Sequence, residues 1–191
     1  MLTHLFAKMT PQARDKTAAE LAPFRDNLTL DESKTLVYTN AVINEALRMA
    51  PPVGNDFRLV AEDVEFPSGL KARRGDRVWL CNMAIGRDTK LWTSPDEFRP
   101  ERWIRKDAEG KPTPPRRVDE FVHPVFLGGP RLCLGKDMAR FEAAVFVAHI
   151  LSRVQVDPVP GQDLDTVVVA PAIFLKDGLK VTVRELKAVT E

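Results

Sequence analysis

A glycine-rich loop that carries a cysteine and leads directly into an apolar helix sets the tightest limits on the fold of this chain. The loop covers residues 126–135, and Cys133 stands near its end. From Gly135 to about Val154 apolar side chains leave little polar surface, which predicts a central helix rather than a surface helix. A cysteine at this place lies near the positive end of a helix dipole and near unpaired backbone N–H groups. Both features favour a thiolate over a thiol, as does the neighbouring Arg131.

The surroundings of Cys133 favour a role as a metal ligand. Three glycines would let backbone amides approach the sulfur, or a flat ligand approach the backbone. A thiolate with N–H contacts is what a haem-thiolate centre requires. The alternative is a cysteine packed in a tight loop, and zinc is disfavoured because no further Cys or His stands at short spacing. Cys81 follows an apolar run and is expected to be a buried small hydrophobic residue.

The composition describes an ordinary globular chain. The 191 residues suffice for one domain with a sizeable core. With 28 basic and 27 acidic side chains, the net charge of +1 argues against nucleic-acid binding, which needs clustered excess basic charge. No apolar run is long enough to span a bilayer, and residues 1–8 are too short for a signal peptide or anchor.

Local spacing predicts a mixture of helices and small sheets. Capping residues, prolines and helical periodicity predict helices over Pro11–Leu21 and Ser33–Met49. The charged segment Lys106–Asp119, with three prolines, is expected to be an exposed loop. Helices, a small sheet, another helix and a second sheet indicate an α+β fold. The predicted strands are Phe57–Val60, Val64–Phe66, Leu70–Ala72, Arg77–Leu80, Val167–Val169 and Leu179–Val183.

The loop resembles the haem-binding signature of the cytochrome P450 superfamily, F-x-x-G-x-R-x-C-x-G. The fixed positions are filled without a mismatch by Phe126, Gly129, Arg131, Cys133 and Gly135. The resemblance implies haem as the cofactor and Cys133 as the axial ligand of its iron. It further implies that the phenylalanine shields the sulfur side and that the arginine pairs with a haem propionate.

Two further motifs occur in the order found in that superfamily. Residues 45–48 read Glu-Ala-Leu-Arg and match E-x-x-R, whose Glu and Arg share one helix face and can pair. Residues 98–103 resemble the P-E-R-F segment, with Trp in place of Phe. The resemblance implies that Arg102 joins Glu45 and Arg48 in a buried structural triad. Breaking such a triad would leave buried charges unpaired.

The resemblance also assigns residues around the cofactor. Arg58 is expected to reach a propionate, the alternative being a solvated arginine on a strand. The segments Val53–Phe57 and Ala170–Ile173 would line the substrate side, the alternative being plain packing. His123 falls outside the fixed positions and is expected to be a structural or surface histidine rather than a ligand.

By resemblance, residues 1–191 form the C-terminal haem-binding portion of the mostly helical P450 fold, with its small antiparallel sheets. No A-G-x-D-T-like segment precedes Glu45, so the oxygen-handling central helix and the N-terminal half are expected to be absent. The implied function is a haem-thiolate monooxygenase that inserts one oxygen atom from O₂ into an apolar substrate. Local similarities, such as Gly86-Arg87-Asp88, point to fatty-acid ω-hydroxylases.

The resemblance implies an electron-donating reductase and an apolar small molecule as partners, with no nucleic acid. The chain is expected to lack an anchor of its own, and the full-length parent is expected at the cytosolic face of the endoplasmic reticulum membrane. Two other functions stay open: a haem-thiolate isomerase or dehydratase, and a truncated fragment without catalysis. Because a pocket without a distal wall cannot exclude water, the chain alone is expected to be inactive and to bind haem weakly.

Overall fold

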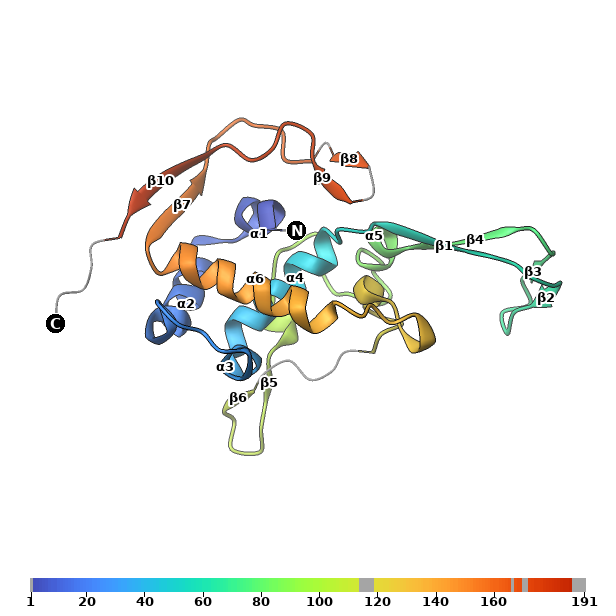
Figure 1. Ribbon diagram of the computed structural model, residues 1–191, viewed down its shortest axis with the longest axis horizontal. Coiled ribbons are helices and arrows are strands. Elements are labelled where there is room, and N and C mark those ends of the chain that lie inside the picture. Colours follow the sequence, from blue (N-terminus) through green and yellow to red (C-terminus); the bar gives the residue numbers. More distant parts are fainter. Residues whose placement is uncertain (1, 114–118, 166, 170–171, 187–191) are drawn as a thin grey trace.

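The computed structural model describes residues 2–113, 119–165, 167–169 and 172–186. A helical body carries small two-stranded sheets around its edge (Figure 1). This arrangement belongs to the α+β class. The sequence predicted that class for the C-terminal part of a mostly helical fold. The helices are α1 (Leu2–Lys8), α2 (Pro11–Leu21), α3 (Leu30–Thr35), α4 (Val37–Met49), α5 (Asn82–Ile85) and α6 (Lys136–Leu151), with short 3-10 turns η1 (Ala22–Phe24), η2 (Pro100–Trp103), η3 (Pro124–Phe126) and η4 (Gly129–Arg131).

Helix α4 is the central element of the body. Every residue from Thr39 to Met49 is buried, because α1, α2, α6 and η2 all pack against this helix. Its polar side chains are therefore removed from water and need internal partners. The apolar core around α4 consists of Leu5, Leu21, Leu28, Leu36, Val42, Ile43, Ala46, Leu47, Ala143, Ala144, Val147, Ala148 and Leu151.

Helix α6 is not the central helix that its apolar composition predicts. One face packs against the core, but Met138 is 66% exposed and Phe146 is 45% exposed. The expectation was wrong because an apolar composition shows only that a helix could be buried on every side. Which faces are covered depends on the elements that pack against the helix. The described residues of this chain cover only one side of α6.

The predicted helix Ser33–Met49 is two helices with a break at Leu36. Thr29 starts α3 through a capping box, in which its hydroxyl accepts from the Glu32 N–H and the Glu32 carboxylate accepts from the Thr29 N–H. Leu36 then takes an extended backbone conformation (φ −65°, ψ 113°), which ends α3. Helical spacing alone did not reveal this break.

A glutamate from α2 caps the start of α4. Glu20 Oε1 accepts from the N–H groups of Val37 and Tyr38 at 2.7 and 2.9 Å. Glu20 Oε2 accepts from the N–H and the hydroxyl of Thr39, both at 2.7 Å. A negative side chain at a helix N-terminus is favourable, and this one satisfies N–H groups that lack helical partners. The cap fixes α4 against α2.

The described strands form antiparallel pairs. Predicted and observed strands agree closely between residues 55 and 81. The last predicted strand is shifted to Val181–Glu185 (β10). The strands Val154–Pro158 (β7) and Ile173–Leu175 (β9) were not predicted. The segment Lys106–Asp119 is not a simple loop, because Pro112–Thr113 (β6) pairs with Arg105–Lys106 (β5). Residues 114–118 of this segment lie outside the described residues. The pairs are β1 (Asn55–Leu59) with β4 (Arg77–Cys81), β2 (Val64–Glu65) with β3 (Lys71–Ala72), β5 (Arg105–Lys106) with β6 (Pro112–Thr113), β7 (Val154–Pro158) with β10 (Val181–Glu185), and β8 (Val167–Val169) with β9 (Ile173–Leu175).

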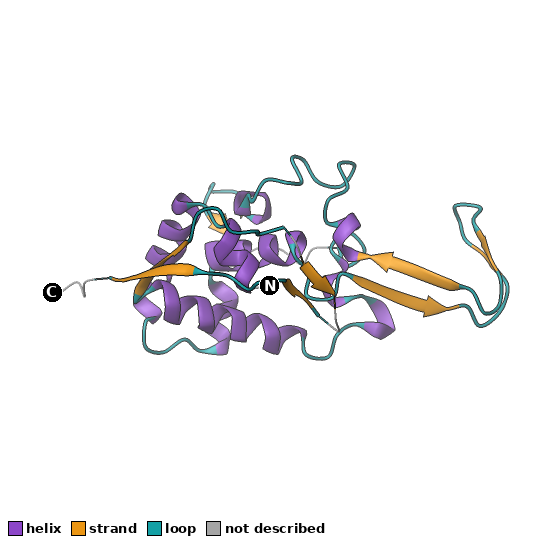
Figure 2. Ribbon diagram, turned by 90° about the horizontal axis from the view of Figure 1, so that it is seen from above, coloured by secondary structure: helices purple, strands orange, loops and turns teal. Residues whose placement is uncertain are grey.

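The β1–β4 ribbon projects away from the helical body (Figure 2). Phe57 pairs with Trp79 across the two strands, with ring centroids 5.1 Å apart, and both side chains face solvent. Cys81, at the end of β4, is also exposed, so the prediction of a buried cysteine was wrong. The apolar run before it lies on a two-stranded ribbon, and no second layer among the described residues covers both of its faces.

Candidate functional site

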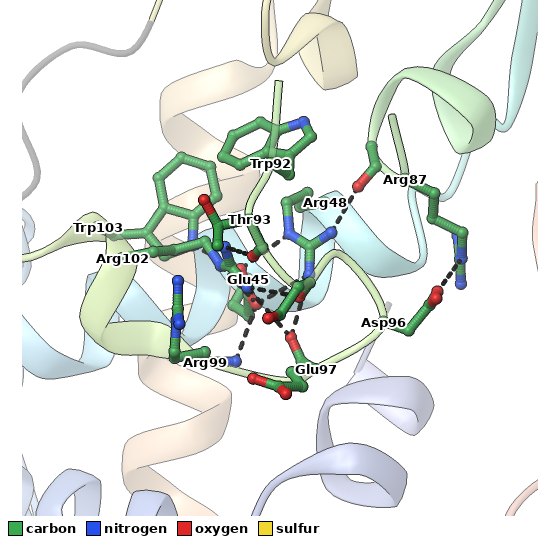
Figure 3. Close-up of polar contacts among 12 residues, drawn as sticks. Glu45, Arg48, Arg87, Trp92, Thr93, Asp96, Glu97, Arg99, Arg102 and Trp103 are labelled. Carbon is green, nitrogen blue, oxygen red and sulfur yellow. Dashed lines mark hydrogen bonds and ion pairs between the residues drawn. The ribbon is translucent and has the colours of Figure 1, made fainter. Parts of the chain in front are cut away.

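The carboxylate of Glu45 lies at the centre of a buried polar cluster (Figure 3). Arg48 donates to it through two nitrogens, Nε to Oε2 at 3.0 Å and Nη2 to Oε1 at 2.9 Å. Arg102 Nε donates to Oε1 at 3.1 Å. The structure thus brings together the three residues that the motifs select, and the side chains of Glu45 and Arg48 are fully buried.

Backbone carbonyls complete the cluster. Arg48 also donates to the carbonyl oxygen of Gly86, and Arg102 donates to those of Thr93 at 2.6 Å and Ser94 at 3.0 Å. One carboxylate faces two guanidinium groups, so these carbonyl dipoles offset the excess positive charge. The segment 86–97 is therefore held against α4 by charge-assisted hydrogen bonds.

Gly86 is required for this approach. A Cβ atom at this position would overlap the carbonyl oxygen of Arg48. The Arg48 guanidinium also lies over the ring of Trp92, with its Cζ atom 5.5 Å from the ring centroid. Every face of Arg48 is thus in contact with the protein.

Two donors to Glu45 were not predicted from the sequence. Trp103 Nε1 donates to Oε2 at 2.8 Å, and the backbone N–H of Arg99 donates to Oε1 at 2.9 Å. The signal for the first was the Trp that stands in place of Phe in the P-E-R-F segment, because only Trp adds an N–H group. The second is a backbone contact and leaves no mark in the sequence.

The cysteine loop is closed by its own backbone. The Cys133 N–H donates to the Phe126 carbonyl at 2.8 Å, and the Leu132 N–H donates to the Gly129 carbonyl at 3.1 Å. Gly129 has φ +59°, which explains the glycine in the motif, whereas Leu127 holds φ +59° without that freedom. The closed loop delivers Cys133 just before α6 begins.

Cys133 opens onto solvent. It is exposed, and it lines a hollow of about 520 Å³ together with Leu132, Leu134, Lys136 and Asp137. Leu134 is fully exposed, and Met138 on the first turns of α6 is also largely exposed. The thiol is therefore bordered by uncovered apolar side chains.

Two arginines approach the same carboxylate near this loop. Arg58 Nη1 donates to Asp56 Oδ2 at 2.6 Å. Burial raises the pKa of Asp56, but hydrogen bonds from Arg58 and the Phe57 N–H, with the charges of Arg58 and Arg131, hold it below its usual value. Arg58 is thus paired within its own strand, and its charge lies close enough to that of Arg131 for both to act on Asp56.

The two segments expected on the substrate side are in contact. The Ile173 N–H donates to the Pro52 carbonyl at 2.6 Å, and a Cβ atom on Gly54 would overlap the Ile173 Cδ1 atom. Val53 and Phe57 are exposed. Of the segment Ala170–Ile173, the first two residues lie outside the described residues.

His123 packs inside the protein beside the Glu45 cluster. Its ring centroid lies 4.9 Å from that of Trp103 and 6.3 Å from that of Trp92. Its Nε2 atom is buried without a hydrogen-bond partner in the structure. Burial, together with the positive charges of Arg140, Arg48 and Lys136, lowers the pKa of His123 to about 3. The histidine is therefore neutral and structural at ordinary pH.

Fold and site define a class of α+β proteins in which a cysteine-bearing loop is joined to a buried Glu–Arg–Arg cluster. A family model described as Cytochrome P450 matches residues 3–182. The chain therefore belongs to the cytochrome P450 family, as the motifs predicted. Members of this family bind haem through a cysteine thiolate. No helix among the described residues has the length and apolar character needed to cross a membrane.

Plant relatives are similar over most of this chain. Cytochrome P450 94A2 of Vicia sativa is 38% identical over 141 residues, which is 73% of this chain and 27% of that relative. Cytochrome P450 94B3 of Arabidopsis thaliana is 36% identical over 160 residues, 82% of this chain and 31% of the relative. Cytochrome P450 86B1 of Arabidopsis thaliana is 35% identical over 177 residues, 91% of this chain and 30% of the relative. The chain thus spans under a third of these relatives.

Proposed function

We propose that residues 1–191 are the C-terminal haem-binding portion of a P450 monooxygenase, which inserts one oxygen atom from O₂ into an apolar substrate. The observation that carries the proposal is the exposed Cys133 thiol, at the end of a backbone-closed loop and beside uncovered apolar side chains. The family membership of the chain supports the same function.

The residues around Cys133 fit a haem. Haem is a flat apolar ring with an iron at its centre and two carboxylates at its edge. Leu134 and Met138 offer exposed apolar surface for the ring, and burying such side chains is favourable. Arg131 and Arg58 supply the positive charge for the carboxylates, and Arg58 would exchange Asp56 for a propionate.

Each residue of the loop then has a defined task. Haem supplies the oxygen and electron-transfer chemistry when it is bound, while the protein binds and orients it. Cys133 would hold the iron as a thiolate, and Phe126 would cover the sulfur side. Gly129 allows the left-handed turn, and Gly135 leaves the backbone accessible beside the sulfur.

The Glu45 triad is proposed as a structural element without a catalytic role. Glu45 and Arg48 are fully buried and the Arg102 side chain is only 7% exposed, so the carboxylate at its centre cannot contact a substrate. The donors to Glu45 from Arg99, Arg102 and Trp103 hold the segment that follows α5 against the central helix α4, and thereby support the haem-side core.

The substrate is proposed to be a fatty acid or another long apolar molecule. Val53, Phe57 and Ile173 place apolar side chains in adjoining segments, as an apolar substrate would require. A reductase would supply the electrons. The localisation proposed for the whole protein is the cytosolic face of the endoplasmic reticulum membrane.

We expect the 191 residues by themselves to hold haem weakly and to lack activity. The hollow beside Cys133 is open to solvent, so a haem lying on this apolar surface would keep its opposite face in water. Water at the iron would prevent retention of an apolar substrate.

Haemin titration of the chain tests the ligand. The wild type, Cys133→Ser and Cys81→Ser are reduced and treated with CO at saturating haemin. Both wild type and Cys81→Ser should give a thiolate-type spectrum, because Cys81 is an equally exposed cysteine outside the loop. Cys133→Ser should lose that spectrum. Three identical spectra would contradict the assignment of Cys133.

A further inference from the structure

A single tryptophan lies between the Glu45 cluster and the cysteine loop. Trp103, in η2, is only 5% exposed. Its indole N–H donates to Glu45 Oε2 at 2.8 Å, and its ring centroid lies 4.9 Å from that of His123. Figure 3 shows the indole beside the carboxylate. One side chain therefore contacts both the buried carboxylate and the segment that leads to the loop.

The indole N–H fills a place that no other described group occupies. Glu45 Oε1 accepts from three donors, whereas Oε2 otherwise accepts only from Arg48 Nε among the described residues. A hydrogen bond to a buried charge is strong because water cannot replace it. Phe, the residue of the P-E-R-F segment, would supply the ring without the N–H. In this chain Trp103 thus supplies both an aromatic ring and a hydrogen-bond donor to Glu45.

A short chain segment connects His123 to the cysteine. Residue 123 is followed directly by η3, and the Leu127 N–H donates to the Pro124 carbonyl at 2.9 Å. The Phe126 carbonyl then accepts from the Cys133 N–H at 2.8 Å. Leu127 holds a left-handed conformation, which persists only where surrounding contacts enforce it. His123 therefore stands directly before the turn that opens the loop.

Packing rather than hydrogen bonding holds the His123 ring. The ring is tilted by 58° against Trp103 and stands at 76° to Trp92, which are favourable arrangements for aromatic pairs. Its Nε2 atom has no hydrogen-bond partner among the described residues, so this nitrogen does not anchor the ring there. The aromatic surface is the feature that the site uses.

We propose that Trp103 is a positioning residue for the Cys133 loop. It completes the donors to Glu45 with its N–H and holds His123 with its ring, so that the buried cluster and the loop keep a fixed relative position. The inference rests on the proposed function only where it treats Cys133 as the haem ligand.

Amide hydrogen exchange of residues 126–134 measures the order of the loop without any cofactor. The full 191-residue chain is compared with His123→Ala, His123→Phe and Trp103→Phe. We expect His123→Ala to speed exchange in this segment about tenfold, because the aromatic contact is lost. His123→Phe keeps a ring and should retain wild-type protection. Exchange in His123→Ala within twofold of the wild type would overturn the proposal.

Thermal unfolding measures the indole donor. Trp103→Phe should lower Tm by roughly 3–10 °C and also speed exchange in the loop. Trp79→Phe, which changes an exposed indole on the β1–β4 ribbon, should leave both unchanged. Glu20→Gln weakens the cap of α4 and should lower Tm without a selective effect on the loop. Equal behaviour of Trp103→Phe and Trp79→Phe would overturn the proposal.

A spectroscopic measurement separates this inference from the proposed function. In haemin-loaded, CO-treated samples, Trp103→Phe should reduce the fraction with a thiolate-type spectrum, and His123→Phe should restore what His123→Ala loses. A thiolate-type spectrum that persists in Cys133→Ser would contradict the proposed function alone. The exchange experiment would still decide the role of Trp103.

Discussion

The Glu45 cluster and the Cys133 loop differ in how far each is complete within this chain. Glu45 and Arg48 are fully buried, and each has its hydrogen-bond partners inside the protein. Cys133 and Leu134 are exposed, although the backbone of their loop is closed. The polar groups of the Glu45 cluster therefore find all their partners within the protein. In the proposed haem site the backbone is ordered by its own hydrogen bonds, but the Cys133 and Leu134 side chains remain exposed.

The largest expected effect comes from removing the charge of the cluster. Glu45→Gln leaves two guanidinium groups without a counter-charge and should lower the free energy of unfolding by about 3–5 kcal/mol. Urea denaturation measures the change. Glu62→Gln, at an exposed position, is the matched control and should stay within about 0.5 kcal/mol of the wild type. A small effect of Glu45→Gln would show that the buried cluster contributes little to the free energy of unfolding.

Acid should lower the free energy of unfolding through protonation of His123. Its pKa is about 3 in the fold against about 6.5 for an unperturbed histidine, so the unfolded chain binds a proton that the folded chain excludes. The stability contribution is therefore complete above pH 6.5 and is lost as pH falls from 6.5 toward 3, by up to about 1.4 kcal/mol per pH unit. Urea unfolding at pH 7 and pH 5 should show a smaller loss in His123→Phe. Equal losses would contradict the buried, neutral state of this ring.

Two glycines give the sharpest contrast between the regions. Gly86→Ala forces a Cβ atom onto the Arg48 carbonyl oxygen and should cost about 1–3 kcal/mol. A Cβ atom on Gly135 would meet only the Cys133 Sγ atom, at 4.0 Å, so Gly135→Ala should change stability by less than about 0.5 kcal/mol. Thermal unfolding of both variants measures the difference, and equal Tm losses would remove the contrast.

The smallest effect on stability is expected at Leu134. Because this side chain is fully exposed, Leu134→Ala should leave the free energy of unfolding within about 0.5 kcal/mol of the wild type. Its apolar surface becomes useful only when haem covers it, so the dissociation constant for haemin should rise. Haemin titration followed by absorbance measures that constant. An unchanged constant would place the haem elsewhere.

Short-range patterns predicted much of this molecule. Helix α2, the first four strands and the closed loop before α6 follow from caps, turns and spacing that lie within a few residues. The contact between Glu45 and Arg48 follows from one helix face. The motif that resembles P-E-R-F selected Arg102, which the structure places 3.1 Å from Glu45. These interactions depend on local geometry or on a motif that carries it.

Long-range packing accounts for what the sequence did not reveal. Glu20 caps α4 from 17 to 19 positions away, and no capping pattern near residue 37 indicates it. Cys81 is exposed because nothing in the described part of the chain covers that face of the ribbon. The extra donor from Trp103 comes from 58 positions away. Such contacts depend on how elements meet, which residue spacing does not encode.

The cysteine loop, the motif residues and the class of fold could be read from the amino-acid sequence, because each depends on residues that are neighbours along the chain. That α4, and not the more apolar α6, is the central helix became clear from the packing of the helices. The reason is that burial depends on neighbouring elements: α4 carries Glu45 and Arg48 but is covered on all sides, since its polar groups find partners there. The structure likewise brought Trp103 and His123 together between the buried cluster and Cys133.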